Sequence, residues 1–232
     1  MSRPRIAVLM DENTSGGGTR YEAAKGYFHG LIAAGAAPFG LPYAPELTGD
    51  AVAGFDGLMT AGGRFAVPDD WYLGAVSPAP ASARPAAERA LVEGFLAAGK
   101  PILGLCAGMQ ALACLNGARM VADLKAWRPQ AGEHDGREVS HRVDIAPGTR
   151  LFDLVGPTLE VNSFHREAIA QLASGVVASG HSPDGIVEAV ELEGHPFALG
   201  LQWHQELLGP DHPGQAIFKG FVEACTVKNR TR

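Results

Sequence analysis

The feature that most constrains this sequence is the stretch from Pro101 to Gln110, which places one cysteine between two glycines. An apolar run of strand length ends at Leu105 and leads through Cys106 straight into a helical pattern. A sharp strand-to-helix turn brings backbone segments too close for a Cβ, and the flanking glycines leave room for that approach. The motif Gly-x-Cys-x-Gly is therefore interpreted as the cysteine form of a nucleophile elbow.

Such a turn lifts the thiol of Cys106 above the edge of a sheet. It also places the thiol near a helix N-terminus, where the helix dipole and free N–H groups favour thiolate over thiol. The alternative is a structural role, since free cysteines are often core residues. The motif is short and does not by itself separate these two interpretations.

The rest of the chain has the pattern of an α/β protein. Strand-like apolar runs cover residues 5–10, 37–42, 55–60 and 102–105, and helical patterns cover residues 21–34, 86–98 and 109–115. The order strand, helix, strand, strand, helix, strand predicts a mostly parallel sheet with helices on both faces. Further strands are predicted at 139–145, 158–164, 175–178, 185–192 and 197–203, before a closing helix at 213–227.

We find no linker composition and predict a single domain over residues 1–232. The predicted fold is a three-layer α/β structure, with a mostly parallel central sheet, flanking helices and additional antiparallel strands. Residues 11–18, 64–85 and 126–138 are predicted to be loops, and 228–232 a polar tail. The first helix is expected to present one apolar stripe, formed by Tyr27, Phe28, Leu31 and Ile32. Trp71 and Tyr72 either anchor the long 64–85 loop to the body or contact substrate, and closure of that loop over a site is left open.

Composition sets limits on function. The chain has 232 residues, of which 46% are hydrophobic and 19% charged, and this favours a sizeable core over disorder. A net charge of -6 argues against a nucleic-acid-binding surface. Three cysteines without a CxxC pair indicate a reducing compartment. Asp11 and Glu12 interrupt the N-terminal apolar run, which is too short for a signal peptide or a membrane span, so we expect a cytoplasmic protein with no membrane partner.

A cysteine nucleophile needs a base and a group that orients the base. In an open α/β sheet, side chains that follow the carboxyl ends of strands share one edge. His204 directly follows the apolar strand predicted at 197–203, and Glu206 lies two residues further on. In an extended chain these two side chains point the same way, so Glu206 is placed to orient the imidazole. The alternative for His204 is a structural cap at the strand end.

Acyl transfer also needs hydrogen-bond donors for an oxyanion. The backbone amides of Ala107, at the start of a helix, and of Gly63, after the strand at 55–60, are two candidates. The alternative for Gly62 and Gly63 is a flexible turn.

The remaining histidines do not form a recognisable ligand pattern. His134 and His141 flank a polar loop without an HExxH motif, so no metal is expected. We interpret His29, His181, His195 and His212 as ordinary surface or hydrogen-bonded residues. No P-loop or G-x-G-x-x-G follows a strand, so nucleotide binding is not indicated.

Together these segments resemble class I glutamine amidotransferase-like proteins, and within them the peptidase C26 group of γ-glutamyl-γ-aminobutyrate hydrolase-like enzymes. The resemblance covers nearly the whole chain and rests on 61–63, 99–110, 161–165, 181–185 and 200–206. It implies a flavodoxin-like class I amidotransferase fold. It also implies a cofactor-independent hydrolase of γ-glutamyl amides that works through a γ-glutamyl thioester.

The resemblance implies a role for each site residue. Cys106 is the implied nucleophile, His204 the general base and then acid, and Glu206 the orienting group. The amides of Gly63 and Ala107 are the implied oxyanion hole. The γ-glutamyl group is expected to contact Gly62, Gln110, Asn162, Ser163, Phe164 and His165.

Three positions depart from the pattern of the group. An acid is common where Phe65 stands, Arg-Asp is common where Arg84 is followed by Pro85, and arginine is common where Ala107 follows the nucleophile. We therefore expect that a charged network near the pocket has been replaced by an apolar surface. Hydrolysis is still expected, but the leaving amine is left open.

Two other functions remain as alternatives. One is a glutaminase subunit that delivers ammonia to a separate synthetase, and the other is a non-catalytic binding protein that keeps the fold. The intact set of Cys106, His204 and Glu206 argues against the second. The expected partner is a small-molecule γ-glutamyl substrate, not a nucleic acid, and the oligomeric state is left open, with a homodimer among the alternatives.

Overall fold

The centre of the molecule is a mixed sheet whose parallel half carries the Cys106 motif. The computed structural model describes residues 2–13 and 17–227, and within them nine strands form this sheet. The parallel half has the order β4 (Ala37–Leu41), β1 (Arg5–Leu9), β5 (Gly57–Thr60), β6 (Ile102–Leu105) and β13 (Ala198–Leu201). Antiparallel strands continue it, in the order β12 (Val187–Leu192), β11 (Val176–His181), β8 (Asp135–Ile145) and β9 (Thr158–Phe164).

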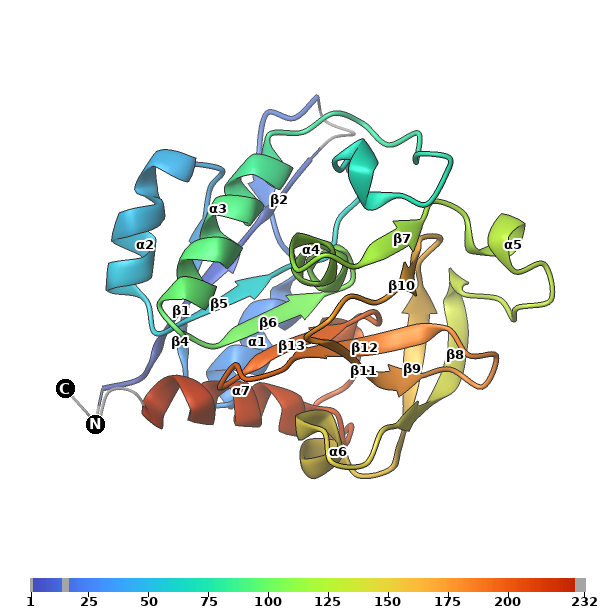
Figure 1. The fold of residues 1–232 in the computed structure, drawn as a ribbon. Helices are drawn as coiled ribbons and strands as arrows, with labels where there is room; N and C mark the ends of the chain where they lie inside the picture. The colour runs from blue at the N-terminus through green and yellow to red at the C-terminus, as the bar shows by residue number, and fades with distance from the viewer. Residues whose placement is uncertain (1, 14–16, 228–232) are drawn as a thin grey trace.

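Helices cover both faces of the sheet (Figure 1). One face packs on α1 (Lys25–Ala33), α6 (Arg150–Val155) and α7 (Gln215–Val227), and the other on α2 (Thr48–Gly54), α3 (Arg84–Ala97) and α4 (Ala107–Leu115). Successive residues of one strand point to opposite faces. In β1, Ile6 and Val8 belong to the first core, and Ala7 and Leu9 to the second. The prediction of a three-layer α/β fold with added antiparallel strands is thus confirmed.

Several local predictions were wrong, mostly where elements are very short. Helix α2 separates β4 from β5, so these strands do not follow one another directly. Its sequence contains two glycines, which weaken the helical signal. Strands β2 (Asp11–Glu12) and β3 (Tyr21–Glu22) pair within segments predicted as loop and helix, and Ile32 is 47% exposed rather than part of the buried stripe.

A second small sheet was also missed. It pairs β7 (Arg119–Val121) with β10 (Ala168–Gln171). Helix α5 (Leu124–Trp127) and the beginning of β8 replace both ends of the loop predicted at 126–138. Such short segments carry too few residues for a hydrophobic period to be recognised. The predicted tail at 228–232 lies outside the described residues.

The long 64–85 loop is anchored by its aromatic residues. Trp71 and Tyr72 are buried in a core shared with α4 and β7, and Tyr72 forms a backbone bridge with Met120. Of the two interpretations of these aromatics, the anchor is the one that the packing supports. A short 3₁₀ turn, Asp69–Trp71, holds the anchor in place.

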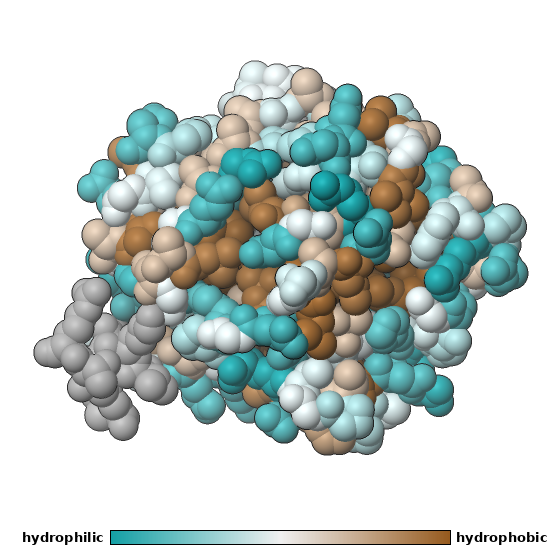
Figure 2. All heavy atoms as spheres, in the orientation of Figure 1, coloured by the Kyte–Doolittle hydropathy of each residue, from teal (hydrophilic) through white to brown (hydrophobic). Residues whose placement is uncertain are grey.

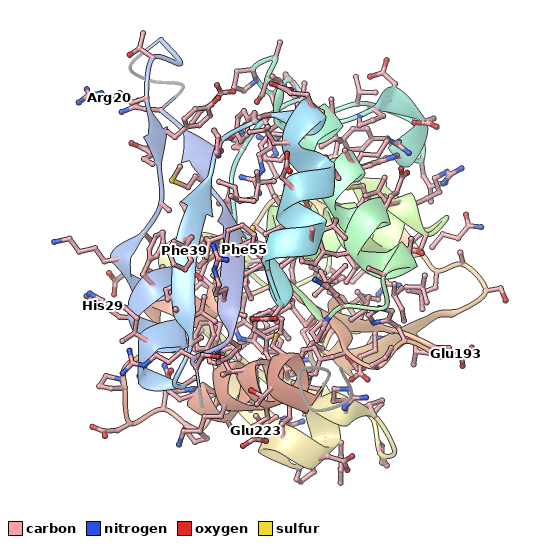
Figure 3. The ribbon with its side chains drawn as sticks, turned by 90° about the vertical axis from the view of Figure 1, so that its left-hand side faces the viewer. Arg20, His29, Phe39, Phe55, Glu193 and Glu223 are labelled. Atoms are coloured by element: carbon pink, nitrogen blue, oxygen red, sulfur yellow. The ribbon has the colours of Figure 1, made fainter. Side chains whose placement is uncertain are left out.

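The outer strand β4 is shielded by a small cluster of side chains. The guanidinium of Arg5 lies 5.3 Å from the ring centre of Phe39 and 5.1 Å from that of Phe55. Both rings lie on the side of the molecule that faces the viewer in Figure 3. A charged group over an edge strand opposes pairing with another chain.

The surface is mixed in hydropathy. Figure 2 shows polar residues over much of one face, with apolar residues set among them near its middle. Among the described residues, no helix is both long and apolar enough to cross a membrane.

The glycines around Cys106 are required by close packing. A Cβ on Gly104 would lie 2.5 Å from the backbone oxygen of Gly108, and a Cβ on Gly108 would lie 2.6 Å from the backbone oxygen of Thr60. Neither glycine has a positive φ, so space rather than backbone conformation explains them. The sequence-based expectation for these two positions is confirmed.

We predict that Gly104→Ala lowers the free energy of unfolding by about 1–3 kcal/mol, because the new methyl group meets backbone that has no room to move. Urea denaturation followed by circular dichroism measures the change. Gly49→Ala on α2 is the matched control, since a Cβ there meets open space. An equal effect of the two substitutions would contradict the packing argument.

Candidate active site

Cys106 occupies a strained turn between β6 and α4. Its φ of 52° and ψ of -108° make it the one non-glycine residue of the described chain with positive φ. Such a conformation costs energy and persists only where the surrounding structure holds it. Here the amide of Cys106 donates to the Leu201 oxygen over 2.7 Å, which continues the pairing of β6 with β13. The predicted elbow is present, with α4 beginning at the next residue.

His204 and Glu206 follow the carboxyl end of β13, on the same sheet edge. Nδ1 of His204 lies 2.7 Å from a carboxylate oxygen of Glu206, and both side chains are largely buried. This contact leaves Nε2 for the thiol. Burial alone lowers the pKa of His204, but hydrogen bonding to Cys106 and Glu206 outweighs it and raises the pKa to about 10. The imidazole is therefore protonated at neutral pH.

Asn162, on the edge strand β9, holds the backbone of His204. Its Nδ2 donates to the His204 oxygen over 2.8 Å, and its Oδ1 accepts from the His204 amide over 2.9 Å. Both polar atoms of the amide are thus engaged by one residue. That Asn162 contacts substrate stays a prediction, and the contact that the structure shows is with the backbone of His204.

The Gly62–Gly63 turn is held from two sides. The Gly62 amide donates to the Tyr27 hydroxyl over 2.9 Å, and Arg84 donates to the oxygens of Ala61 and Gly62. A Cβ on Gly62 would lie 2.9 Å from Cε1 of His204, so only glycine fits beside the imidazole. These contacts fix the backbone that carries the Gly63 amide, one of the two predicted oxyanion donors.

A cavity of about 290 Å³ opens in front of these groups. Cys106, His204 and the two predicted oxyanion donors, Gly63 and Ala107, all line it. Its remaining wall is formed by Arg64, Phe65, Val67, Ser77, Gln110, Asp135, Phe164, His165, Arg166 and Glu167. A thiol, an imidazole paired with a carboxylate, and the two residues whose amides are the predicted oxyanion donors therefore meet at one cavity. Groups of these kinds are the ones that acyl transfer requires.

Only half of the predicted substrate-contacting residues reach this cavity. Gln110, Phe164 and His165 line it, whereas Gly62, Asn162 and Ser163 do not. Ser163 is buried and its hydroxyl donates to the His134 oxygen over 3.0 Å. The alternation of β9 explains this, because Ser163 and Phe164 point to opposite faces of the sheet.

The three departures noted in the sequence have different surroundings. Phe65 lines the cavity and its ring lies 4.5 Å from the guanidinium of Arg84, which is fully buried and paired with Asp11 and Glu88. Pro85 stands in the first turn of α3 and does not line the cavity. Ala107, the third departure, also lines the cavity. A cluster of charged side chains around Arg84 therefore lies next to Phe65. The replacement of charged groups by an apolar surface at positions 65, 85 and 107 stays a prediction.

Three residues that support the site were not recognised in the sequence. Tyr27 was assigned only to a helical stripe, and Arg84 was noted only for its neighbour. Gln202 lies with Nε2 3.8 Å from the Cys106 sulfur and accepts from Gln110 over 3.1 Å. Each of the three residues supports the site through tertiary contacts. Their neighbours in the sequence form no pattern that would indicate this role.

Comparison with known proteins identifies the family. The Peptidase C26 family model matches residues 5–206. The chain belongs to the peptidase C26 family. γ-Glutamyl-γ-aminobutyrate hydrolase PuuD of Escherichia coli is 30% identical over 241 residues, which cover 97% of this chain and 94% of that protein. Rv2859c of Mycobacterium tuberculosis is 34% identical over 210 residues, and the match spans 86% of this chain and 66% of that protein.

Solved structures agree on the fold. The glutaminase domain of Trypanosoma brucei CTPS with bound acivicin aligns with a TM-score of 0.67 at 18% identity, covering 97% of this chain and 94% of that one. The matched family and relatives support a hydrolase of the glutamine amidotransferase type.

We predict that the C2 proton of His204, followed by NMR, titrates with a pKa of about 10. Glu206→Gln removes a carboxylate that favours the imidazolium and is expected to lower this value. Glu193→Gln, which changes an exposed carboxylate on a distant turn, is the matched control and leaves the titration unchanged. Equal titration curves in both variants would contradict the assigned pairing.

Proposed function

We propose that the protein is a cysteine-dependent hydrolase of γ-glutamyl amides, with Cys106, His204 and Glu206 as its catalytic residues. The observation that carries the proposal is the strained Cys106 turn, which faces His204 and two backbone amides across one cavity. Membership of peptidase C26 and the similarity to a γ-glutamyl-γ-aminobutyrate hydrolase support the substrate class.

In the first half-reaction, the Cys106 thiolate attacks the γ-carbonyl carbon of the substrate. The C=O electron pair moves to oxygen, and the amides of Gly63 and Ala107 donate to the resulting oxyanion. The C–N bond then breaks as His204, protonated at neutral pH, gives its proton to the departing amine. A γ-glutamyl thioester and a free amine result.

In the second half-reaction, neutral His204 takes a proton from water as the water oxygen attacks the thioester carbon. Collapse of the tetrahedral intermediate releases glutamate and the thiolate, and His204 is again protonated. In both half-reactions Glu206 stabilises the imidazolium form of His204, because its carboxylate lies 2.7 Å from Nδ1.

The cavity supports recognition of an amino-acid head group. Its wall carries two arginines, Arg64 and Arg166, and two acids, Asp135 and Glu167. An α-carboxylate and an α-ammonium group need partners of opposite sign, which these residues supply. Phe65, Val67 and Phe164 add an apolar part to the same wall, which suits an apolar leaving amine.

A glutaminase that supplies ammonia to a separate synthetase is the second candidate. The likeness of the chain to CTP synthase, 35% identical over 157 residues, favours it. That match spans 55% of this chain and 28% of the relative. The two candidates share every chemical step and differ in whether ammonia or a larger amine leaves.

We predict that wild-type protein releases amine from γ-glutamyl amides, and that Cys106→Ala lowers kcat/KM by about 10⁴-fold or more because no nucleophile remains. A panel of γ-glutamyl amides, with the released amine identified by mass spectrometry, measures this. Cys114→Ala is the matched control, since Cys114 is buried away from the cavity.

Two outcomes of the panel would count against the proposal. Equal activity of Cys106→Ala and wild type would overturn the mechanism. If γ-glutamyl-γ-aminobutyrate were cleaved as well as apolar amides, the preference for an apolar amine would be wrong. Turnover of glutamine alone, rising only with an added synthetase, would favour the second candidate.

We predict that Asn162→Ala lowers kcat by roughly ten- to a hundredfold while KM changes little, because two hydrogen bonds of about 1 kcal/mol each no longer position His204. Steady-state kinetics on the best amide of the panel separate the two constants. Asn116→Ala, whose amide bonds to the Leu112 oxygen, is the matched control. A raised KM with unchanged kcat would instead restore the substrate-contact role.

A further inference from the structure

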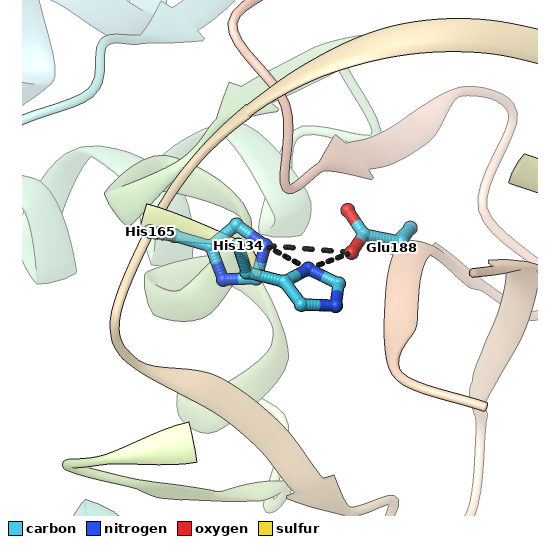
Figure 4. Close-up of side chains that lie close together, drawn as sticks. All are labelled: His134, His165 and Glu188. Carbon is cyan, nitrogen blue, oxygen red and sulfur yellow. Dashed lines mark hydrogen bonds and ion pairs between the residues drawn. The ribbon is translucent and has the colours of Figure 1, made fainter. Parts of the chain in front are cut away.

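Three buried side chains converge at the wall of the cavity, and one of them, His165, is part of that wall. His134 precedes β8, His165 follows β9, and Glu188 lies on β12, so three separate parts of the chain meet there. Figure 4 shows both imidazole rings directed at one oxygen of the Glu188 carboxylate. The exposed fractions are 3% for His134, 5% for His165 and 0% for Glu188.

The two inner ring nitrogens and the Glu188 oxygen are evenly spaced. Nδ1 of His134 lies 3.2 Å from Nε2 of His165 and 3.2 Å from Oε1 of Glu188, and the third side of the triangle is 3.4 Å. Zinc–nitrogen bonds of about 2.0–2.1 Å place neighbouring ligands of a tetrahedron about 3.3 Å apart. The three atoms therefore have the spacing of one face of a tetrahedral site.

The outer ring nitrogens of His134 and His165, which point away from Glu188, determine which ring atoms carry hydrogen. Nδ1 of His165 donates to the Glu167 oxygen over 2.9 Å, and Nε2 of His134 lies 3.1 Å from an Asp184 oxygen. Because both partners accept hydrogen bonds, each outer nitrogen carries the hydrogen of its neutral ring. The inner nitrogens of both rings then present lone pairs to one another and to a carboxylate.

Nearby groups do not supply a hydrogen-bond donor of good geometry to the Glu188 carboxylate. The Ser163 hydroxyl lies 3.0 Å from the backbone oxygen of His134 and 3.4 Å from its Nδ1, so the shorter contact takes its hydrogen to the backbone oxygen. Nδ1 of His141 lies 3.2 Å from the backbone oxygen of Arg142. The inner nitrogen of His141, Nε2, lies 3.5 Å from the same Glu188 oxygen. Neither oxygen of Glu188 has a hydrogen-bond donor of good geometry among the described residues. A fully buried carboxylate in such surroundings needs a cation.

We propose that His134, His165 and Glu188 form a Zn²⁺ site, with His141 or water as the fourth ligand. Imidazole and carboxylate are ligands that zinc prefers, and buried metal-binding histidines usually donate their second N–H to a carboxylate or a backbone oxygen. His134 and His165 do so, to Asp184 and to Glu167. The site is structural, since it fixes the strand ends that carry the cavity wall.

The competing cation is a proton held on His134. Nε2 of His134 lies 3.1 Å from Asp184 and Nδ1 lies 3.2 Å from Glu188, so a proton on either nitrogen faces a carboxylate oxygen. Zinc has to displace that proton, so its affinity is expected to fall as the pH is lowered. This inference does not depend on the proposed hydrolase activity.

Zinc titration of the full chain carrying Cys106→Ala tests the proposal, because that substitution removes the thiol that could bind metal with His204. After dialysis against a chelator, we expect one equivalent of Zn²⁺ to bind, measured by competition with a chromophoric chelator. His29→Gln, which alters an exposed histidine, keeps this binding. His134→Gln and Glu188→Gln weaken it by at least about 100-fold, and Asp184→Asn by about 10–100-fold.

A second measurement needs no further variant. In the Cys106→Ala chain, Zn²⁺ is expected to shift the ring-proton NMR signals of His134 and His165 and to leave those of His29 unchanged. Absence of these shifts, or of zinc binding at neutral pH, would overturn the proposal and leave a proton as the cation. Undiminished zinc binding by folded His134→Gln and Glu188→Gln chains would do the same.

Discussion

The register between β6 and β13 decides whether this chain has a site at all. Leu105 pairs with Leu201, so the next residues of both strands, Cys106 and Gln202, leave the sheet at the same level. His204 then lies beside the thiol although 98 positions separate the two in sequence. A shift of one residue would turn the strand's side chains to the other face. The apolar layers on both faces oppose such a shift, because every residue of β6 and β13 is buried.

The common edge of the parallel strands made part of the site predictable from sequence. Cys106, His204 and Glu206 could be placed together from sequence, because parallel strands bring their carboxyl ends to one edge. The extended chain assumed for His204 and Glu206 is absent, since β13 ends at Leu201 and a 3₁₀ turn, Gln205–Leu207, brings the carboxylate to the imidazole. The residues of β9 were harder to assign. Their strand was predicted correctly, but which of them face the cavity depends on how β9 lies against the turn after β13. Asn162 and Ser163, which were predicted to contact substrate, do not line the cavity.

The fold was predictable in outline and less so in its short pieces. Long apolar runs such as 5–10 and 55–60 predicted the parallel strands well. Helix α2 and the β7–β10 pair were missed because their local signals are weak and tertiary packing stabilises them. The meeting of His134, His165 and Glu188 could not be predicted either, since these residues come from three segments with no shared spacing.

Helix α1 contacts both the turn after β13 and the loop after β5, which lie on two sides of the cavity. A Cβ on Gly26 would lie 1.9 Å from the backbone oxygen of Glu206, and the next residue, Tyr27, holds the Gly62 amide. One helix turn therefore contacts both Glu206, which is paired with His204, and the loop that carries the Gly63 amide. Because both contacts come from one helix turn, a displacement of α1 would disturb both sides of the cavity at once.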